Sequence, residues 1–214
     1  MIAVAEARPT VEEFLKICVQ VRIDRDLYKT LFEVDTKLID VYQNIAPLCF
    51  GDLRRIFVEH LFLQFCKVTD AAGAGSRTNL TTNYVMQEID WPNEIREKLQ
   101  PINDDLMEFR RLVEPARSKR IAHTDLSAQM QQLASLGKFP AGADWKFVEN
   151  LEQFVSVAYK HVTGSPAGLP AAMDHDTYRF IRALEKSVLY GQCTKCSENE
   201  RIVALLAQRP QRGR

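Results

Sequence analysis

The sequence predicts an all-α protein built as a bundle of five to seven helices. Apolar residues recur at steps of three and four along most of the chain, no segment has the sustained alternation of a strand, and no fixed-period repeat is visible. The 214 residues are 46% hydrophobic and 26% charged, which is typical of a globular domain and excludes disorder, collagen and a disulfide-rich miniprotein. We therefore expect one large helical domain.

The first helix is expected to begin at a capping box, in which Thr10 and Glu13 satisfy each other's backbone donors. From Val11 to Ile45 there is no Gly or Pro, and the apolar spacing is helical. This stretch forms either one long helix or two. The charged residues 23–26 favour a break or kink there.

The next helix is expected to start at Pro47, which a first helical turn tolerates, and to run to about Lys67. Residues 70–78, rich in Gly and Ala, predict a loop, and residues 79–88 a short helix. The apolar stripe of the longer helix comprises Leu53, Ile56, Phe57, Leu61 and Val68.

Another long helix is expected from Pro92 to about Val113, ended or kinked by Pro115. Its stripe of Leu99, Ile102, Leu106 and Phe109 is interpreted as core rather than binding surface. Further helical segments are expected over residues 116–123, 145–161 and 175–190, with a loop at 137–142 and Gly191 as the final stop. We place a helical domain over residues 10–190 and a polar tail over residues 191–214.

Charge, cysteine content and hydropathy limit the partners and the cellular compartment that we expect for the protein. Lys plus Arg and Asp plus Glu both number 28, so evidence for a nucleic-acid partner has to be local. Five unevenly spaced cysteines indicate free thiols, and the chain starts without a signal-peptide pattern, so we expect a cytoplasmic protein. The most apolar uncharged stretch, residues 41–51, is too short to span a membrane.

A local excess of positive charge lies at residues 110–120, which contain five cations and one anion. Arg117 in this run is followed, after five intervening residues, by His123. An Arg supplies a permanent delocalised cation, and a His transfers protons near neutral pH. These are the two kinds of group needed to cleave RNA without a metal: the His takes the proton of the 2′-hydroxyl or gives a proton to the leaving oxygen, and the Arg stabilises charge on the phosphorane.

The spacing alone does not identify the site, because His60 also follows two arginines, Arg54 and Arg55. We interpret His60 as a core or half-buried residue of its helix. The stretch from Arg117 to Asp125, Arg-Ser-Lys-Arg-Ile-Ala-His-Thr-Asp, resembles the R-polar-K-x-x-A-H-x-D signature of the HEPN superfamily, in the branch typified by abortive-infection protein U. Residues 67–70 and 79–81 are similar to the "R-L-x-D, loop, N-L-S" segment of that branch.

The resemblance implies a helical bundle that dimerises so that two Arg/His motifs face each other. It implies a metal-independent endoribonuclease of phage defence or a toxin, without cofactor or metal, with Arg117 and His123 catalytic. The expected partners are RNA, a second copy and a cognate antitoxin protein. Residues expected to bind or orient the substrate are Ser118, Lys119, Arg120 and Asp125; Asp125 either orients His123 or caps the following helix.

Other interpretations remain open at this point. The chain is alternatively a catalytically inactive helical module that binds RNA or a protein, or a purely structural dimer. The cations of residues 110–120 then serve only a helix C-terminus. Cys193 and Cys196 form a C-x-x-C pair without further metal ligands nearby or a βαβ setting, so we favour an incidental pair over a metal or redox site.

Overall fold

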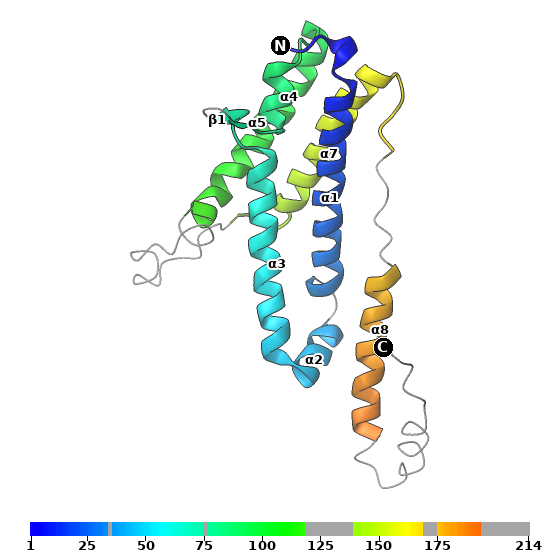
Figure 1. Ribbon diagram of the computed structural model, residues 1–214. Helices are drawn as coiled ribbons and strands as arrows, with labels where there is room; N and C mark the ends of the chain where they lie inside the picture. Colours follow the sequence, from blue (N-terminus) through cyan, green and yellow to red (C-terminus); the bar gives the residue numbers. More distant parts are fainter. Residues whose placement is uncertain (34–35, 75–76, 119–138, 169–174, 194–214) are drawn as a thin grey trace. The chain divides into compact units, whose positions relative to one another are not determined.

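The computed structural model describes residues 1–33, 36–74, 77–118, 139–168 and 175–193, and it confirms the all-α class (Figure 1). Seven α-helices occur in these ranges, within the expected number. The described strands are two residues long each and pair antiparallel. The elements are η1 (Val4–Glu6), α1 (Arg8–Phe32), α2 (Thr36–Ile45), α3 (Pro47–Val68), β1 (Gly73–Ala74), β2 (Arg77–Thr78), α4 (Thr82–Glu88), α5 (Asn93–Ala116), α7 (Ala143–Thr163) and α8 (His175–Cys193).

The chain divides into two compact units. The first comprises residues 1–26 and 55–172, and the second residues 27–54 and 173–214. The domain boundary expected at residue 190 stays a prediction. No helix in the described part of the chain is both long and apolar enough to cross a membrane.

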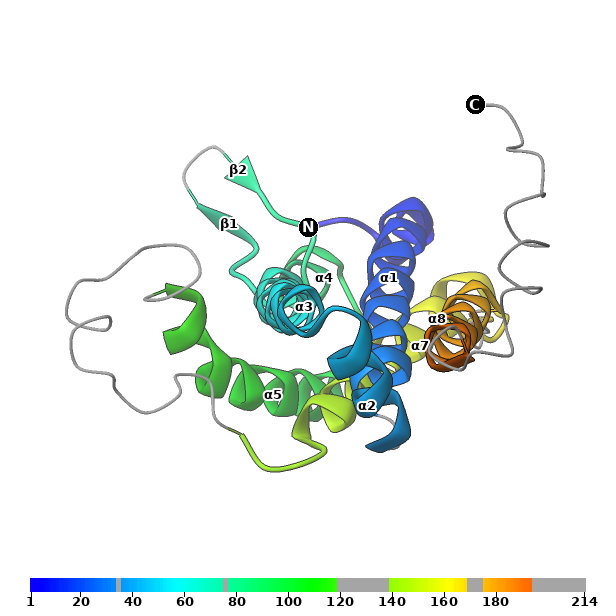
Figure 2. The ribbon, with the colours of Figure 1, turned by 90° about the horizontal axis from the view of Figure 1, so that it is seen from below.

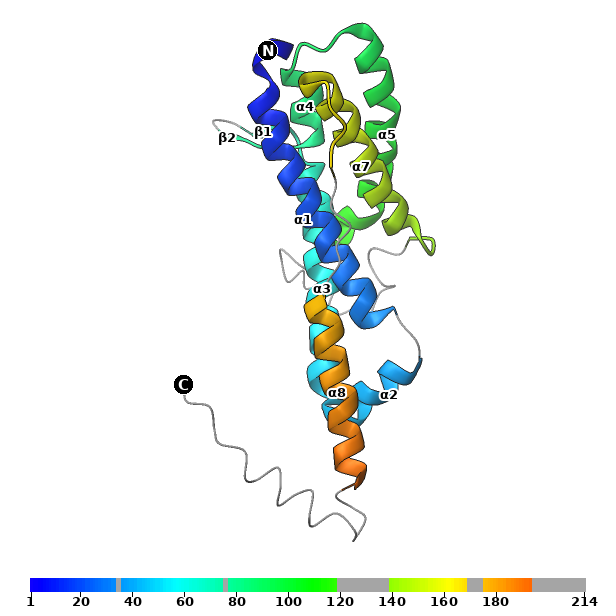
Figure 3. The ribbon, with the colours of Figure 1, turned by 90° about the vertical axis from the view of Figure 1, so that its right-hand side faces the viewer.

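The core of the first unit is a cluster of aromatic rings from different helices. Phe65 of α3 lies against Phe109 of α5 and Phe147 of α7, with ring centroids 5.6 and 4.8 Å apart, and Phe109 and Phe147 are 5.0 Å apart. Phe14 of α1 packs edge-on against Phe154 of α7. Figure 3 shows α5 and α7 side by side. The predicted core positions of α5 are confirmed, because Leu99, Ile102, Leu106 and Phe109 are all buried, and Val113 is buried as well.

Helix α1 runs without interruption through residues 23–26, so the break favoured there is wrong. The charges of this segment are paired rather than left to disrupt the helix. Arg22 donates to Asp26 one turn later at 2.8 Å, and Arg25 donates to Asp144 of α7 at 2.6 Å. The helix ends instead after Phe32, and α2 begins at Thr36.

Three local expectations are also wrong. Helix α1 begins at Arg8, ahead of the predicted cap at Thr10, because Pro9 is compatible with a first helical turn. Gly191 lies inside α8 rather than ending it. Leu53 and Ile56, placed on the apolar stripe of α3, are exposed. By contrast, α5 ends one residue after Pro115, as expected.

The second unit contains a smaller aromatic cluster around Tyr42 of α2. Its ring stacks on Phe50 with centroids 4.0 Å apart, and its hydroxyl donates to the Leu31 carbonyl at 2.9 Å. Burial raises the pKa of Tyr42 to about 12. Helices α2 and α8 pack against each other, and Thr177 of α8 is buried.

The Arg25–Asp144 pair tests how much a buried charge stabilises the first unit. Arg25 has 4% of its side chain exposed and Asp144 has 14%. Arg25→Ala leaves a carboxylate in a nearly dry site without its cation, so we expect the free energy of unfolding to fall by about 3 kcal/mol. Urea denaturation followed by circular dichroism measures this. Arg8→Ala, which breaks an exposed pair with Glu12, serves as the control and should leave the midpoint close to that of the wild type; equal effects of the two substitutions would contradict the interpretation.

Candidate active site at the end of α5

Arg117 stands at the point where α5 ends. Its backbone N–H donates to the carbonyls of Val113 and Glu114, so Arg117 continues the helical conformation directly after Ala116. The Arg117 side chain is 30% exposed, and Ser118 is exposed. The arginine of the predicted motif is therefore accessible and attached to a defined helix end.

The remaining residues of the predicted site are Lys119, Arg120, His123 and Asp125, and all four lie outside the described residues. Their roles stay predictions, as does the pairing of Arg117 with His123.

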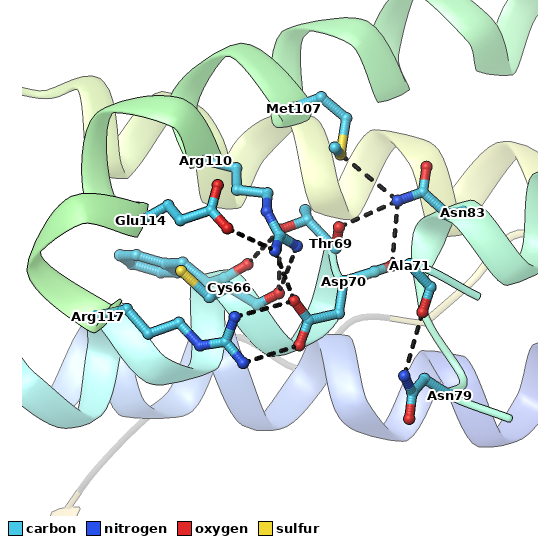
Figure 4. Close-up of polar contacts among 11 residues, drawn as sticks. Cys66, Thr69, Asp70, Ala71, Asn79, Asn83, Met107, Arg110, Glu114 and Arg117 are labelled. Atoms are coloured by element: carbon cyan, nitrogen blue, oxygen red, sulfur yellow. Dashed lines mark hydrogen bonds and ion pairs between the residues drawn. The ribbon is translucent and has the colours of Figure 1, made fainter. Parts of the chain in front are cut away.

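The side chain that faces Arg117 is Asp70, two residues after the end of α3. The two terminal nitrogens of Arg117 donate to its two carboxylate oxygens, Nη1 to Oδ1 at 3.2 Å and Nη2 to Oδ2 at 3.3 Å (Figure 4). This contact joins residues 67–70 to the start of the 117–125 motif, the two stretches that carry the resemblance. A parallel pair of this kind fixes the plane of the guanidinium as well as its position.

A second arginine, Arg110, binds the same carboxylate. Its Nη2 lies 2.6 Å from Oδ1 of Asp70 and 3.3 Å from Oε1 of Glu114, and its Nη1 donates to the Cys66 carbonyl at 3.2 Å. Only 11% of the Arg110 side chain is exposed. Burial alone would lower the pKa of Arg110, but the hydrogen bonds to Asp70 and Glu114 raise it. Together, Asp70, Arg110, Glu114 and Arg117 form one polar group, which we call the charge cluster.

In the sequence, Arg110 and Glu114 stand out only as charges in a run, and nothing local connects them with Asp70. A signal was present in the spacing. Arg110 and Arg117 are seven residues apart, close to two helical turns, and Arg110 and Glu114 are four apart, so all three share a face of α5.

Asparagine side chains hold the backbone of residues 69–71, which follow the end of α3. Asn83 of α4 donates from Nδ2 to the carbonyls of Thr69 and Asp70, at 3.0 and 3.1 Å. Asn79 donates to the Ala71 carbonyl at 3.2 Å. These bonds fix the backbone of Asp70 before the hairpin of β1 and β2 begins (Figure 2). The position of the Asp70 backbone is thus fixed by contacts other than those to the arginines.

His60, the histidine of the second Arg/His spacing, is exposed, so a core position for it is wrong. Its side chain is 45% exposed. Its Nε2 lies 2.9 Å from Oδ2 of Asp24, and Arg55 pairs with Glu59 on the same helix. His60 therefore links α3 to α1.

The Cys66 thiol lies beside the charge cluster and is fully buried. Burial raises its pKa to about 11, against a smaller lowering by Arg110 and Arg117. The thiol is consequently neutral at physiological pH and is not a nucleophile there. Cys193 ends α8, whereas Cys196 lies outside the described residues. No group of three or more His, Cys, Asp or Glu side chains among the described residues is arranged to hold a metal ion.

Comparison with known families agrees with the motif. The model of the HEPN family AbiU2 matches residues 6–186, a span that contains the whole charge cluster and the 117–125 motif. The chain belongs to the AbiU2 family of HEPN domains. The resemblance found in the motif is thereby confirmed at the level of the AbiU2 family. No curated protein and no solved structure matches the chain.

Because the pKa of Cys66 is raised in the folded protein, the free energy of unfolding should fall at alkaline pH. The unfolded thiol ionises near its ordinary pKa of 9 and the folded one near 11, so the contribution of Cys66 is complete below pH 9 and is lost as the pH rises toward 11. The stability difference between wild type and Cys66→Ala should therefore shrink by about 1 to 2 kcal/mol between pH 8 and pH 10.5. Urea midpoints of both proteins at each pH measure it. A difference that stays constant would contradict the raised pKa.

Proposed function

We propose that this AbiU2-family chain is a metal-independent endoribonuclease, in which the 2′-hydroxyl of RNA attacks the adjacent phosphate. The observation that carries the proposal is the geometry of Arg117. Asp70 occupies the two terminal nitrogens end-on, while Nε and the outer N–H of Nη2 bond no acceptor among the described residues. That second edge of the guanidinium is a fork of two donors, which matches two oxygens of a phosphate.

The reaction assigns a distinct task to each motif residue. His123 takes the proton of the 2′-hydroxyl or delivers a proton to the departing 5′-oxygen, and Arg117 stabilises the charge that builds up on the phosphorane. The phosphorus–5′-oxygen bond breaks, so the products are a 2′,3′-cyclic phosphate and a 5′-hydroxyl. Lys119 and Arg120 are proposed to contact flanking phosphates, and Ser118 and Asp125 to orient the site.

A homodimer is part of the proposal. Cleavage needs one base and one acid, whereas one motif supplies a single histidine. A two-fold axis that brings two motifs together supplies both. We further propose that the enzyme acts in the cytoplasm as a toxin or phage-defence effector and that a cognate antitoxin protein restrains it.

The second candidate is a catalytically inactive module that binds RNA or a protein. The ion pair itself favours it, because Asp70 already neutralises Arg117 in the absence of a ligand. Under this candidate the wild type binds its partner but leaves every RNA intact.

The chemistry of attack predicts the substrate range. Total RNA should be cleaved in the presence of EDTA and leave 2′,3′-cyclic phosphate ends, and DNA of the same sequence should stay intact because it lacks the attacking hydroxyl. Denaturing gels and mass spectrometry of the fragments measure both results. An oligonucleotide with 2′-O-methyl groups is the matched control and should resist cleavage. Loss of cleavage in EDTA, or cleavage of DNA, would contradict the mechanism.

Substitutions of the two histidines separate the motif from its chance copy. His123→Ala should slow cleavage by about 10² to 10⁴ because proton transfer is lost. Arg117→Lys should also be poor, since an ammonium does not bond two phosphate oxygens as a guanidinium does. His60→Ala removes the same ring elsewhere and should keep the wild-type rate. Initial rates on one labelled RNA measure all three; loss of activity in folded His60→Ala, with His123→Ala unaffected, would assign the site to the wrong histidine.

A further inference from the structure

One carboxylate serves two arginines in the charge cluster, and the two contacts are unequal. Asp70 lies 2.6 Å from Nη2 of Arg110 but 3.2 and 3.3 Å from the terminal nitrogens of Arg117. The shorter pair is also the more buried one, because Arg110 is 11% exposed and Arg117 is 30% exposed. Arg110 therefore determines where the carboxylate sits, and Arg117 follows the carboxylate.

Arg110 cannot itself take a phosphate in this arrangement. Its terminal nitrogens are already engaged with the Cys66 carbonyl, Asp70 and Glu114, and its guanidinium lies inside the protein (Figure 4). Arg117, by contrast, is accessible and has one donor edge unused among the described residues. Arg110 thus holds the Asp70 carboxylate in place, and Arg117 is the arginine that can contact a phosphate.

Charge adds to the effect of geometry. The charge cluster contains two cations and two anions, so its formal charge is zero. Without Arg110, Asp70 and Glu114 face Arg117 alone, and the formal charge at the site becomes −1. A phosphate approaching Arg117 would then be repelled rather than tolerated.

From these contacts we infer that Arg110 is a positioning residue that acts on Arg117 through Asp70, keeping the Arg117 guanidinium oriented and available to an RNA phosphate. The inference rests on the proposed ribonuclease function and extends it to a residue outside the Arg/His motif. In this inference Asp70 orients Arg117. Arg110 shares the negative charge of the Asp70 carboxylate.

Substitutions of Arg110 and of Asp70 are expected to affect RNA binding differently. Arg110→Gln should weaken binding of an uncleavable 2′-O-methyl RNA about tenfold at low salt, because a compensating cation is lost. Asp70→Asn should leave binding unchanged or tighter, because a carboxylate that competes with phosphate is lost, yet lower kcat about tenfold or more, because Arg117 is no longer oriented. A merely structural role would move both variants in the same direction.

Arg111→Gln is the matched control. It removes the same charge at the next position of α5, but Arg111 is exposed and makes no ion pair among the described residues. Its binding and kcat should stay within about twofold of the wild type, as expected for a screened surface charge. Effects equal to those of Arg110→Gln would attribute the result to general charge and overturn the inference.

A double-mutant cycle in the full chain tests whether Arg110 affects kcat through Asp70. If Arg110 acts through Asp70, then Arg110→Gln should lower kcat in the wild type but cause little further loss in the Asp70→Asn background. Additive losses would overturn the inference. Thermal unfolding of each variant sets an assay temperature at which all are folded. If Arg110→Gln does not fold, Arg110→Lys takes its place, because an ammonium keeps the charge but not the fixed set of three contacts; the same suppression is then expected, from a smaller loss.

The two failures are distinguishable in this design. If the wild type cleaves no RNA, the proposed function is wrong and the inference falls with it. If the wild type cleaves RNA and the cycle is additive, the function stands and only the role of Arg110 is wrong.

Discussion

The carboxylate of Asp70 is the contact on which the candidate site depends, because it ties the end of α3 to the end of α5. Helix C-termini carry unpaired carbonyls and a partial negative charge, and cations stabilise them. Arg110 meets this need across the interface, since it donates to the Cys66 carbonyl in the last turn of α3. One guanidinium therefore serves a helix end and a carboxylate at once, so Arg110 does more than stabilise the end of its own helix.

The aromatic core holds these charges together. Phe65 precedes Cys66 in α3, and Phe109 precedes Arg110 in α5, and the two rings are 5.6 Å apart. The contact between the rings sets the distance between α3 and α5 next to Cys66 and Arg110. At this distance Arg110 donates to the Cys66 carbonyl. Burial of the rings thus provides the free energy that brings Arg110 and Asp70 out of water, a step that costs more than an ion pair alone returns. The charge cluster lies where it does because the core is next to it.

Sequence periodicity was enough to predict the helical class and the buried face of α5, because each buried residue repeats at helical spacing. It was not enough at residues 23–26, where Arg25 finds Asp144 more than a hundred residues later. The same limit applies to the site. Arg117 was identified from its motif, but the sharing of Asp70 between two arginines depends on packing of α3 against α5, which local pattern does not contain. His60 does not lie in the core because Ile56, one turn earlier on α3, is itself exposed and so does not mark a buried face.

An arginine that stabilises a phosphorane has to satisfy two opposing requirements. It must be held in one orientation, which needs an acceptor, and it must keep positive charge for the phosphate, which an acceptor removes. A carboxylate bound by Arg117 alone meets the first requirement at the expense of the second. Sharing Asp70 with Arg110 relaxes the conflict, because the nearer cation takes the larger part of the negative charge while the end-on geometry at Arg117 is kept. The polar environment of Arg117 is thus consistent with both an ordered guanidinium and an open donor edge.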